Sequence, residues 1–251
     1  MPLLEVTKLN RRFGGLHAVN DVSFKVTAGM IKGLIGPNGA GKTTVFNLIS
    51  GMLRSDSGTI LFNGQPIHHM APHKIATSGI FRTFQNIKLF AKMTVLENVM
   101  IGRHTKSNAG MAAGLFNLPR TWKEEKQIRE HALAMLDLLG IAHFAHVDAQ
   151  SLAFGQQRYV ELARALAGEP TLLLLDEPAA GLNIHETEQL GELIRKIKSL
   201  GITILLVEHD MSLVMTVCDE LVVLSFGQVI VEGKPREIQR HPEVIRVYLG
   251  Q

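Results

Sequence analysis

A glycine-rich segment that ends in a lysine and a threonine has the composition of a phosphate-binding loop. It reads Gly36, Pro37, Asn38, Gly39, Ala40, Gly41, Lys42, Thr43, which fits G-x-x-x-x-G-K-[ST] at every fixed position. Glycines let the backbone curl until successive N–H groups converge on phosphate oxygens, and the following helix adds the partial positive charge of its N-terminus. The pattern predicts that Lys42 reaches the β and γ phosphates of a nucleotide and that the Thr43 hydroxyl ligates Mg²⁺. Thr44 either touches phosphate as well or is an ordinary first-turn residue.

Two carboxylates follow a run of four leucines, at Asp176 and Glu177. An apolar strand that delivers a carboxylate to the edge of a sheet supplies the second protein contact that a phosphate-bound Mg²⁺ needs. We therefore assign Asp176 to the metal and Glu177 to a water molecule in line with the γ-phosphate, as general base. In isolation such a pair after a strand is a solvated turn, and the phosphate loop favours the catalytic interpretation.

Three further side chains are candidates on weaker grounds. His209 follows an apolar strand and is placed to hydrogen-bond the γ-phosphate and to hold Glu177 and the water; a lone histidine is more often structural. Gln85 closes an expected strand, Ile80 to Phe84, from which its amide reaches Mg²⁺ or the attacking water. Phe13 either stacks on an adenine ring or packs as an ordinary aromatic residue.

The elements that must position these residues alternate between strand and helix. Met30 to Ile35 is an expected strand that leads through the phosphate loop into a helix from about Lys42 to Ser50. Strands are expected again at Leu172 to Leu175 and Ile202 to Val207 with a helix between them, and this alternation implies a parallel sheet covered by helices. Period-two alternation near the N-terminus predicts two further half-buried strands.

Between about residues 86 and 168 the pattern becomes helical. Apolar residues at Ile128, Ala132, Met135, Leu136 and Leu139 lie on one face at a spacing of 3.6 residues. The stretch Gly102 to Arg120 is rich in small and polar residues without periodicity, which predicts a long surface loop or arm. We interpret the whole chain as one domain with this helical subdomain inserted, because 251 residues suit a single large α/β unit.

Composition narrows the class of protein. A net charge of +3, from 26 basic and 23 acidic residues, is too small to argue for nucleic-acid binding despite the pI near 9.0. The single Cys218 cannot form an intrachain disulfide and is expected to be a small buried hydrophobe. No run of about 18 apolar residues is present, and the N-terminus lacks a secretory pattern. We therefore expect a cytosolic chain whose membrane-spanning partners, if it has any, are other subunits.

The motifs above, in this order and joined to Leu152-Ala-Phe-Gly-Gln-Gln-Arg158, resemble the nucleotide-binding subunit of ABC transporters over nearly the whole chain. The resemblance implies a P-loop NTPase fold of the ABC ATPase type, with a mostly parallel sheet core, an N-terminal antiparallel β-subdomain and the inserted helical subdomain. It implies that Leu152 to Gln156, here called the signature segment, caps ATP held by the opposite protomer through Ala153, Gly155 and Gln156. It also implies that Gln85 relays closure to a membrane subunit.

Two segments depart from the common family form, at three residues. Ala153 and Phe154 replace a serine and a glycine of the signature segment, which puts one hydrogen bond to the partner's phosphate in doubt. Asn183 stands where the loop after the base usually carries Asp, which puts communication between the two sites in doubt. The residues at these positions and the C-terminal sequence resemble those of the subgroup that energises import of branched-chain amino acids. The implied partners are membrane-spanning permease subunits, a second identical or related ATPase subunit and, indirectly, a periplasmic or extracellular binding protein.

Several alternatives stay open on the sequence. Related cassettes serve urea, other amino acids or lipopolysaccharide export, and the transported molecule would not touch this chain. A soluble ABC ATPase acting on DNA or ribosomes usually has two cassettes, coiled-coil insertions or basic arms, none of which is found here. A small-molecule kinase shares the phosphate loop but has no need of the signature segment.

Overall fold

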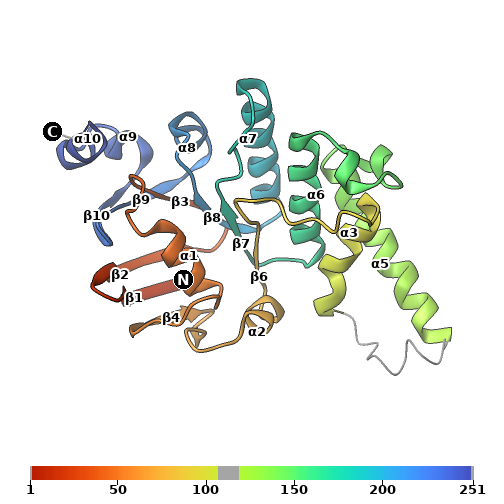
Figure 1. Ribbon diagram of the computed structural model, residues 1–251, viewed down its shortest axis with the longest axis horizontal. Coiled ribbons are helices and arrows are strands. Elements are labelled where there is room, and N and C mark those ends of the chain that lie inside the picture. Colours follow the sequence, from red (N-terminus) through yellow and green to blue (C-terminus); the bar gives the residue numbers. More distant parts are fainter. Residues whose placement is uncertain (1, 107–118, 250–251) are drawn as a thin grey trace. The chain divides into compact units, whose positions relative to one another are not determined.

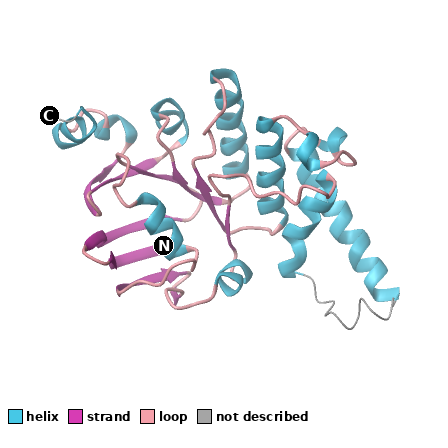
Figure 2. Ribbon diagram, viewed as in Figure 1, coloured by secondary structure: helices cyan, strands magenta, loops and turns pink. Residues whose placement is uncertain are grey.

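The computed structural model describes residues 2–106 and 119–249, which form two compact units. Unit 1 consists of the chain up to Arg82 and from Thr171 onward, and unit 2 is Thr83–Pro170. Within the described residues, all named strands belong to unit 1, and unit 2 is built of helices and loops (Figures 1 and 2).

A mostly parallel sheet forms the centre of unit 1, with the strand order β10-β9-β3-β8-β7-β6. Strands β6 to β9 and β3 run parallel, and β10 is antiparallel to β9. Every residue of β3, β7 and β8 is buried, as expected for central strands covered on both faces. The bounds are β3 Ile31–Ile35, β6 Ile80–Arg82, β7 Leu172–Asp176, β8 Thr203–Val207, β9 Glu220–Ser225 and β10 Gln228–Gly233.

An antiparallel sheet of order β2-β1-β4-β5 completes unit 1. Its strands are β1 Pro2–Phe13, β2 Leu16–Thr27, β4 Ser57–Phe62 and β5 Gln65–Pro66. Helix α1, Lys42–Ile49, buries Val45, Phe46, Leu48 and Ile49 in one hydrophobic core with side chains from both sheets. Both sheets therefore fix the position of the helix that follows the phosphate loop.

The remaining helices of unit 1 are α2 Pro72–Thr77, α7 Ile184–Ser199, α8 Met211–Val217, α9 Pro235–Ile238 and α10 Pro242–Leu249. Cys218, at the end of α8, is 9% exposed, and burial raises the pKa of its thiol to about 12. It is thus the inert buried residue that its isolation in the sequence predicted.

Unit 2 packs α3 Val95–Gly102, α5 Pro119–Leu138 and α6 Phe154–Ala167, with short 3₁₀ helices at Arg103–Lys106, Ala142–Phe144 and Ala149–Ser151. Thr94 and Glu97 form a reciprocal capping box at the start of α3. Asn98 is fully buried, and the two hydrogens of its amide are shared among the carbonyls of Phe90, Met93 and Thr94. These bonds hold the loop before α3 against the helix.

The α/β fold with a parallel core and an antiparallel N-terminal sheet is confirmed, and several details differ from expectation. Strand β6 ends at Arg82 rather than Phe84. The strands β4, β5 and β9 and the short helices α2 and α8 were not expected. Most of the expected arm, residues 107–118, lies outside the described residues. Residues 86–168, expected to form a helical subdomain, lie inside unit 2, and their membership of one nucleotide-binding domain stays a prediction.

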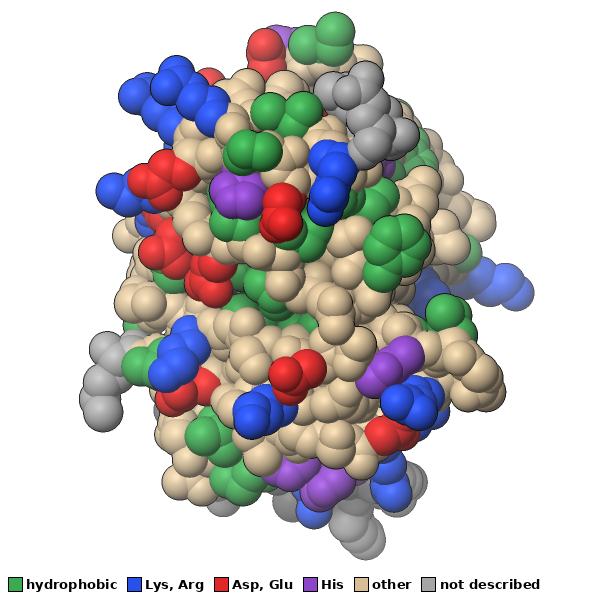
Figure 3. All heavy atoms as spheres, turned by 90° about the vertical axis from the view of Figure 1, so that its left-hand side faces the viewer, with side chains coloured by type: hydrophobic (Ala, Val, Ile, Leu, Met, Phe, Trp, Pro, Cys, Tyr) green, Lys and Arg blue, Asp and Glu red, His purple; other side chains and the backbone are tan. Residues whose placement is uncertain are grey.

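The described surface carries charges of both signs. On the face that Figure 3 shows, Lys and Arg side chains lie among Asp and Glu side chains. Some opposite charges form ion pairs on the surface of unit 1, where Lys25 Nζ is 3.0 Å from Glu5 and Arg11 Nη1 is 2.7 Å from Asp56. Among the described residues, no helix has both the length and the apolar character that crossing a bilayer requires.

Candidate functional site

The phosphate loop leaves β3, and close packing fixes its backbone. Gly36, Gly39 and Gly41 have φ values of 148°, 82° and 100°, a region that residues with a side chain rarely adopt. A Cβ atom at Gly36 would lie 2.1 Å from the carbonyl oxygen of Leu224, and one at Gly41 would lie 2.4 Å from that of Ala18. Gly36 and Gly41 thus meet both conditions of the motif, an unusual backbone conformation and a close approach to neighbouring strands, whereas Gly39 meets the first alone.

Lys42 opens helix α1 and is 6% exposed. Its ammonium donates to the carbonyl oxygens of Gly36, at 2.7 Å, and Pro37, at 3.0 Å, so that it crosses the curl of the loop. Burial lowers the pKa of Lys42, while the nearby carboxylates of Glu177 and Asp176 act in the opposite direction. The Lys42 ammonium therefore lies at the base of the loop, close enough to Glu177 and Asp176 to interact with them electrostatically.

A hollow of about 410 Å³ opens over this loop. It is lined by Phe13, Leu16, His17, Ala18, Asn38, Gly39, Ala40, Gly41, Lys42, Thr43, Thr44, Glu177, Phe226 and Gly227. The structure thus brings Phe13, the phosphate loop with Thr43 and Thr44, and Glu177 together. Phe13 ends β1, is 43% exposed, and has the Arg11 guanidinium 4.9 Å from its ring centre. A partly exposed aromatic ring that lines this hollow suits stacking on a planar base better than ordinary core packing.

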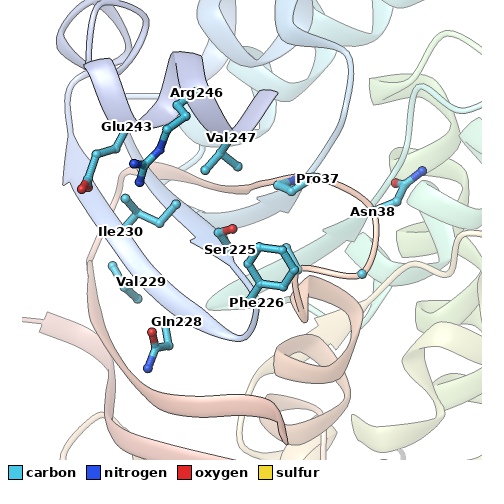
Figure 4. A pocket seen from close by; sticks show the side chains of 12 residues that line it. Pro37, Asn38, Ser225, Phe226, Gln228, Val229, Ile230, Glu243, Arg246 and Val247 are labelled. Carbon is cyan, nitrogen blue, oxygen red and sulfur yellow. The ribbon is translucent and has the colours of Figure 1, made fainter. Parts of the chain in front are cut away.

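A larger hollow of about 780 Å³ adjoins the same loop and lies between Pro37–Ala40, the β9–β10 turn and α10 (Figure 4). Glu243 and Arg246 of α10 lie at its edge, with Val229 and Ile230 among its lining residues. Neither Lys42 nor Glu177 lines it. The smaller hollow is therefore the candidate site, because the residues able to bind phosphate and activate water meet there.

Glu177 and His209 come together at the ends of adjacent parallel strands. Glu177 follows β7 and His209 follows β8 by two residues, and His209 Nδ1 is 3.7 Å from Glu177 Oε2. The Glu177 side chain is 17% exposed and that of His209 is 59% exposed. A mostly buried carboxylate beside an accessible imidazole is a suitable pair for taking a proton from water and holding the reacting groups in place.

Asp176 is the last residue of β7, and the structure pairs it with a residue that the sequence analysis did not single out. Arg82 Nη2 donates to Asp176 Oδ2 at 2.7 Å, and the two side chains are 8% and 5% exposed. The other Arg82 nitrogen, Nη1, donates to Asn47 Oδ1 at 2.7 Å and Ser50 Oγ at 2.9 Å, both on α1. Arg82 therefore ties the strand that carries Asp176 to the helix that carries Lys42 and Thr43.

The predicted residues of unit 2 form their own cluster at the start of α6. Ala153 is the N-cap residue of this helix, and its N–H donates to Gln156 Oε1 at 3.1 Å. Alanine has no side-chain oxygen to return a bond to the helix, so only half of a capping box is present. Phe154 is 49% exposed with the Arg158 guanidinium 5.7 Å from its ring centre. That Ala153, Gly155 and Gln156 contact nucleotide stays a prediction.

Gln85 also belongs to unit 2, and a side chain of α6 binds its backbone. Arg158 is 1% exposed and donates to the carbonyl oxygens of Phe84, at 2.8 Å, and Gln85, at 3.0 Å. Glu161 accepts from the Phe84 N–H at 3.2 Å and pairs with Arg158 at 3.1 Å. Because these backbone groups bond to α6 side chains, Gln85 does not close a strand, which corrects the expected strand end.

Asn183, at the position where the resemblance leads us to expect Asp, is the N-cap residue of α7. Its side chain accepts from the Glu186 N–H at 3.0 Å, and the Glu186 carboxylate accepts from the Asn183 N–H at 2.9 Å. This capping box starts α7 directly after the loop that begins at Glu177. An amide oxygen fills the N-cap role as well as a carboxylate does.

The donor set fits a nucleotide with Mg²⁺. Glycines hold the backbone of residues 36–41 open, and the Lys42 ammonium, the N-terminus of α1 and the Thr43 hydroxyl face the same hollow. Asp176 does not line this hollow, and its carboxylate, at the end of β7, is the second hard oxygen ligand of the kind that Mg²⁺ prefers. Among the described residues, no cluster of three or more His, Cys, Asp or Glu side chains suited to a metal is present. A metal held only with help from the ligand's own phosphate oxygens is consistent with that finding.

We predict that Arg82→Met lowers the free energy of unfolding by about 3–5 kcal/mol, because it leaves the buried Asp176 carboxylate without its guanidinium. Urea-induced unfolding followed by circular dichroism measures this loss. The matched control is Lys25→Met, which removes an exposed pair with Glu5 and is expected to cost less than about 1 kcal/mol. Equal losses in the two variants would contradict the role given to the buried pair.

We predict that Ala153→Ser raises the stability of the chain by about 1 kcal/mol, because a serine oxygen completes the capping box with Gln156. Ala134→Ser, at an exposed position inside α5, is the control and is expected to lower the stability by a few tenths of a kcal/mol. Thermal unfolding of both variants measures the difference. A shift of the same sign in both would show that capping is not the cause.

Comparison with known proteins agrees with this geometry. The family model described as ABC transporter matches residues 19–180, and a model described as branched-chain amino acid ATP-binding cassette transporter matches residues 228–251. The chain is 45% identical over 251 residues to the high-affinity branched-chain amino acid transport ATP-binding protein BraF of Pseudomonas aeruginosa, covering 100% of this chain and 98% of that one. It is 43% identical to LivG of Escherichia coli, of the same description and with the same coverage.

Solved structures are similar to this chain as well. A nucleotide-free ATP-binding cassette from an ABC transporter and an ADP-bound conformation of such a cassette each have a TM-score of 0.87 and 33% identity, with 100% coverage of both chains. The matched family model spans the phosphate loop, Asp176 and Glu177. The chain therefore belongs to the ABC transporter family, as one of its ATP-hydrolysing cassettes.

Proposed function

We propose that the chain powers the import of branched-chain amino acids, as an ATPase subunit bound to the cytoplasmic face of the cell membrane. The observation that carries the ATPase part is the shared hollow in which Lys42, Thr43 and Glu177 meet over the phosphate loop. The cargo rests on the names of relatives at 43–45% identity and on the C-terminal family match. Cassettes for other cargoes remain the alternative that a transport assay decides.

Each residue has a defined part in this mechanism. The N–H groups of residues 36–41 and the Lys42 ammonium bind the phosphates, and Phe13 stacks on the adenine. Thr43, Asp176 and Gln85 would hold Mg²⁺, which would neutralise phosphate charge when bound. Glu177 takes the proton of the attacking water, and His209 holds Glu177 and the γ-phosphate in place.

The two units together form a single nucleotide-binding domain in this proposal, and two such domains work as a dimer. Ala153, Gly155 and Gln156 of one subunit cap the nucleotide on the other, with the N-terminus of α6 directed at the phosphate. ATP-driven closure moves the permease subunits, and hydrolysis reopens the dimer. A second, related cassette protein is the expected partner, and a periplasmic or extracellular binding protein delivers the amino acid.

We predict that Glu177→Gln lowers kcat for ATP hydrolysis by about 100- to 10,000-fold, the usual contribution of a general base, while ATP affinity changes little. Lys42→Ala is the complementary variant and should weaken ATP binding about 10- to 100-fold, because a charge-assisted phosphate bond is lost. Steady-state hydrolysis and nucleotide titration measure the two effects. Unchanged turnover in the first variant, or unchanged affinity in the second, would reject the corresponding assignment.

We predict that the tagged chain, purified from native membranes in mild detergent, carries two different multi-span subunits and a second cassette protein. Mass spectrometry identifies them, and uptake of labelled leucine by reconstituted vesicles tests the cargo. Recovery of the chain with no membrane protein would favour a soluble ABC ATPase instead. Uptake of urea or another amino acid, but not leucine, would keep the ATPase role and change the cargo.

A further inference from the structure

Glu208 is a buried carboxylate to which the proposed mechanism gives no part. It lies between β8 and His209 and has no exposed surface. Its Oε1 accepts from the N–H of Ala179 at 2.7 Å, and its Oε2 accepts from the N–H groups of His209, at 2.9 Å, and Asp210, at 3.1 Å. One side chain therefore joins the loop after β7 to the loop after β8.

Placing this carboxylate in the core is costly. Burial raises the pKa of Glu208, and the backbone N–H bonds from Ala179, Asp210 and His209 act against that rise. An apolar side chain would fill the same space without that cost. The three bonds therefore indicate that the position orders the two loops and does not merely fill volume.

The loop after β7 needs such support because of the conformation of Glu177. This residue has a φ of 46°, in the left-handed region that residues with a Cβ adopt only when the surroundings enforce it. Two backbone bonds hold the turn, from Glu177 N–H to the Val207 carbonyl at 2.9 Å and from Ala180 N–H to the Glu177 carbonyl at 3.1 Å. The Ala179 bond to Glu208 is the third, and a side chain makes it.

The same carboxylate also lies beside the imidazole. Glu208 Oε2 is 3.6 Å from His209 Nδ1, and that nitrogen is 3.7 Å from Glu177 Oε2. Glu208 is thus bonded to the backbone of the loop that carries Glu177 and of the loop that carries His209. It is not itself among the residues that line the hollow.

We propose that Glu208 is a positioning residue for ATP hydrolysis, which sets the turn that aims Glu177 and the orientation of His209. This inference rests on the proposed function, since it takes Glu177 as the general base. It assigns Glu208 to the geometry of the chemical step and not to the binding of ATP, because its bonds reach the ends of β7 and β8 and not the phosphate loop.

The experiment compares Glu208→Gln with Glu177→Gln and with a control, Asp219→Asn. Glutamine keeps the size of Glu208 but has a single acceptor oxygen, so it cannot serve donors in both loops. Asp219 Oδ2 accepts from the Ile31 N–H at 2.7 Å, which makes it a carboxylate-to-backbone bond at the start of β3, away from the hollow. ATP turnover, ATP affinity and thermal stability are measured on the full chain.

We expect Glu208→Gln to lower kcat about 10- to 100-fold, as small misplacements of reacting groups do, with the ATP Kd within about twofold of the starting value. Asp219→Asn should keep kcat within about twofold. The double variant Glu208→Gln with His209→Ala should lose less than the product of the two single losses, because both act on one arrangement.

The other outcomes are equally decisive. Normal turnover in Glu208→Gln beside an inactive Glu177→Gln would overturn the positioning role and leave the proposed function intact, whereas an active Glu177→Gln would overturn the function itself. A rise in Kd that parallels a loss of folded protein would assign Glu208 to stability alone. If Glu208→Gln does not fold, Glu208→Asp gives the same test, since it keeps the charge but shortens its reach.

Discussion

The arrangement of unit 1 depends on holding a short stretch of backbone open. The phosphate loop must leave N–H groups available for phosphate, so few internal bonds stabilise it, such as that from the Ala40 N–H to the Pro37 carbonyl at 3.2 Å. Support comes from outside, since Gly36 lies against the carbonyl of Leu224 in β9 and Gly41 lies against that of Ala18 in β2. The loop is thus fixed between strands of two different sheets, and α1 is fixed in their shared core.

Buried charged side chains also hold the elements around the phosphate loop in place. Lys42, Arg82, Asp176 and Glu208 are each less than a tenth exposed, and each is bonded to groups on a different element from its own or across the loop. The Arg82–Asp176 pair adds little net stability compared with apolar packing, yet removing one partner is expensive. The buried charges therefore act mainly to fix where the ends of β7, β8 and α1 lie relative to one another.

Much of this could be predicted from the sequence, because the phosphate loop and the Asp176–Glu177 pair are local patterns whose geometry follows from a few adjacent residues. Arg82 and Glu208 were missed because their meaning depends on partners far along the chain, Asp176 in one case and Ala179 in the other. A signal was available, since each is a charged residue within or next to a run of apolar strand residues. The end of β6 was also missed, because it depends on Arg158 and Glu161 in a helix more than seventy residues away.

The early end of β6 has a consequence for how the chain behaves in a crowded solution. β6 is an edge strand of the main sheet with three residues, and β5 is an edge strand of the other sheet with two. The unpaired backbone groups of an edge strand can pair with strands of other chains, and a very short edge strand offers few of them. These two edges offer very little, so the same contacts that redirect Phe84 and Gln85 also shorten a template for aggregation.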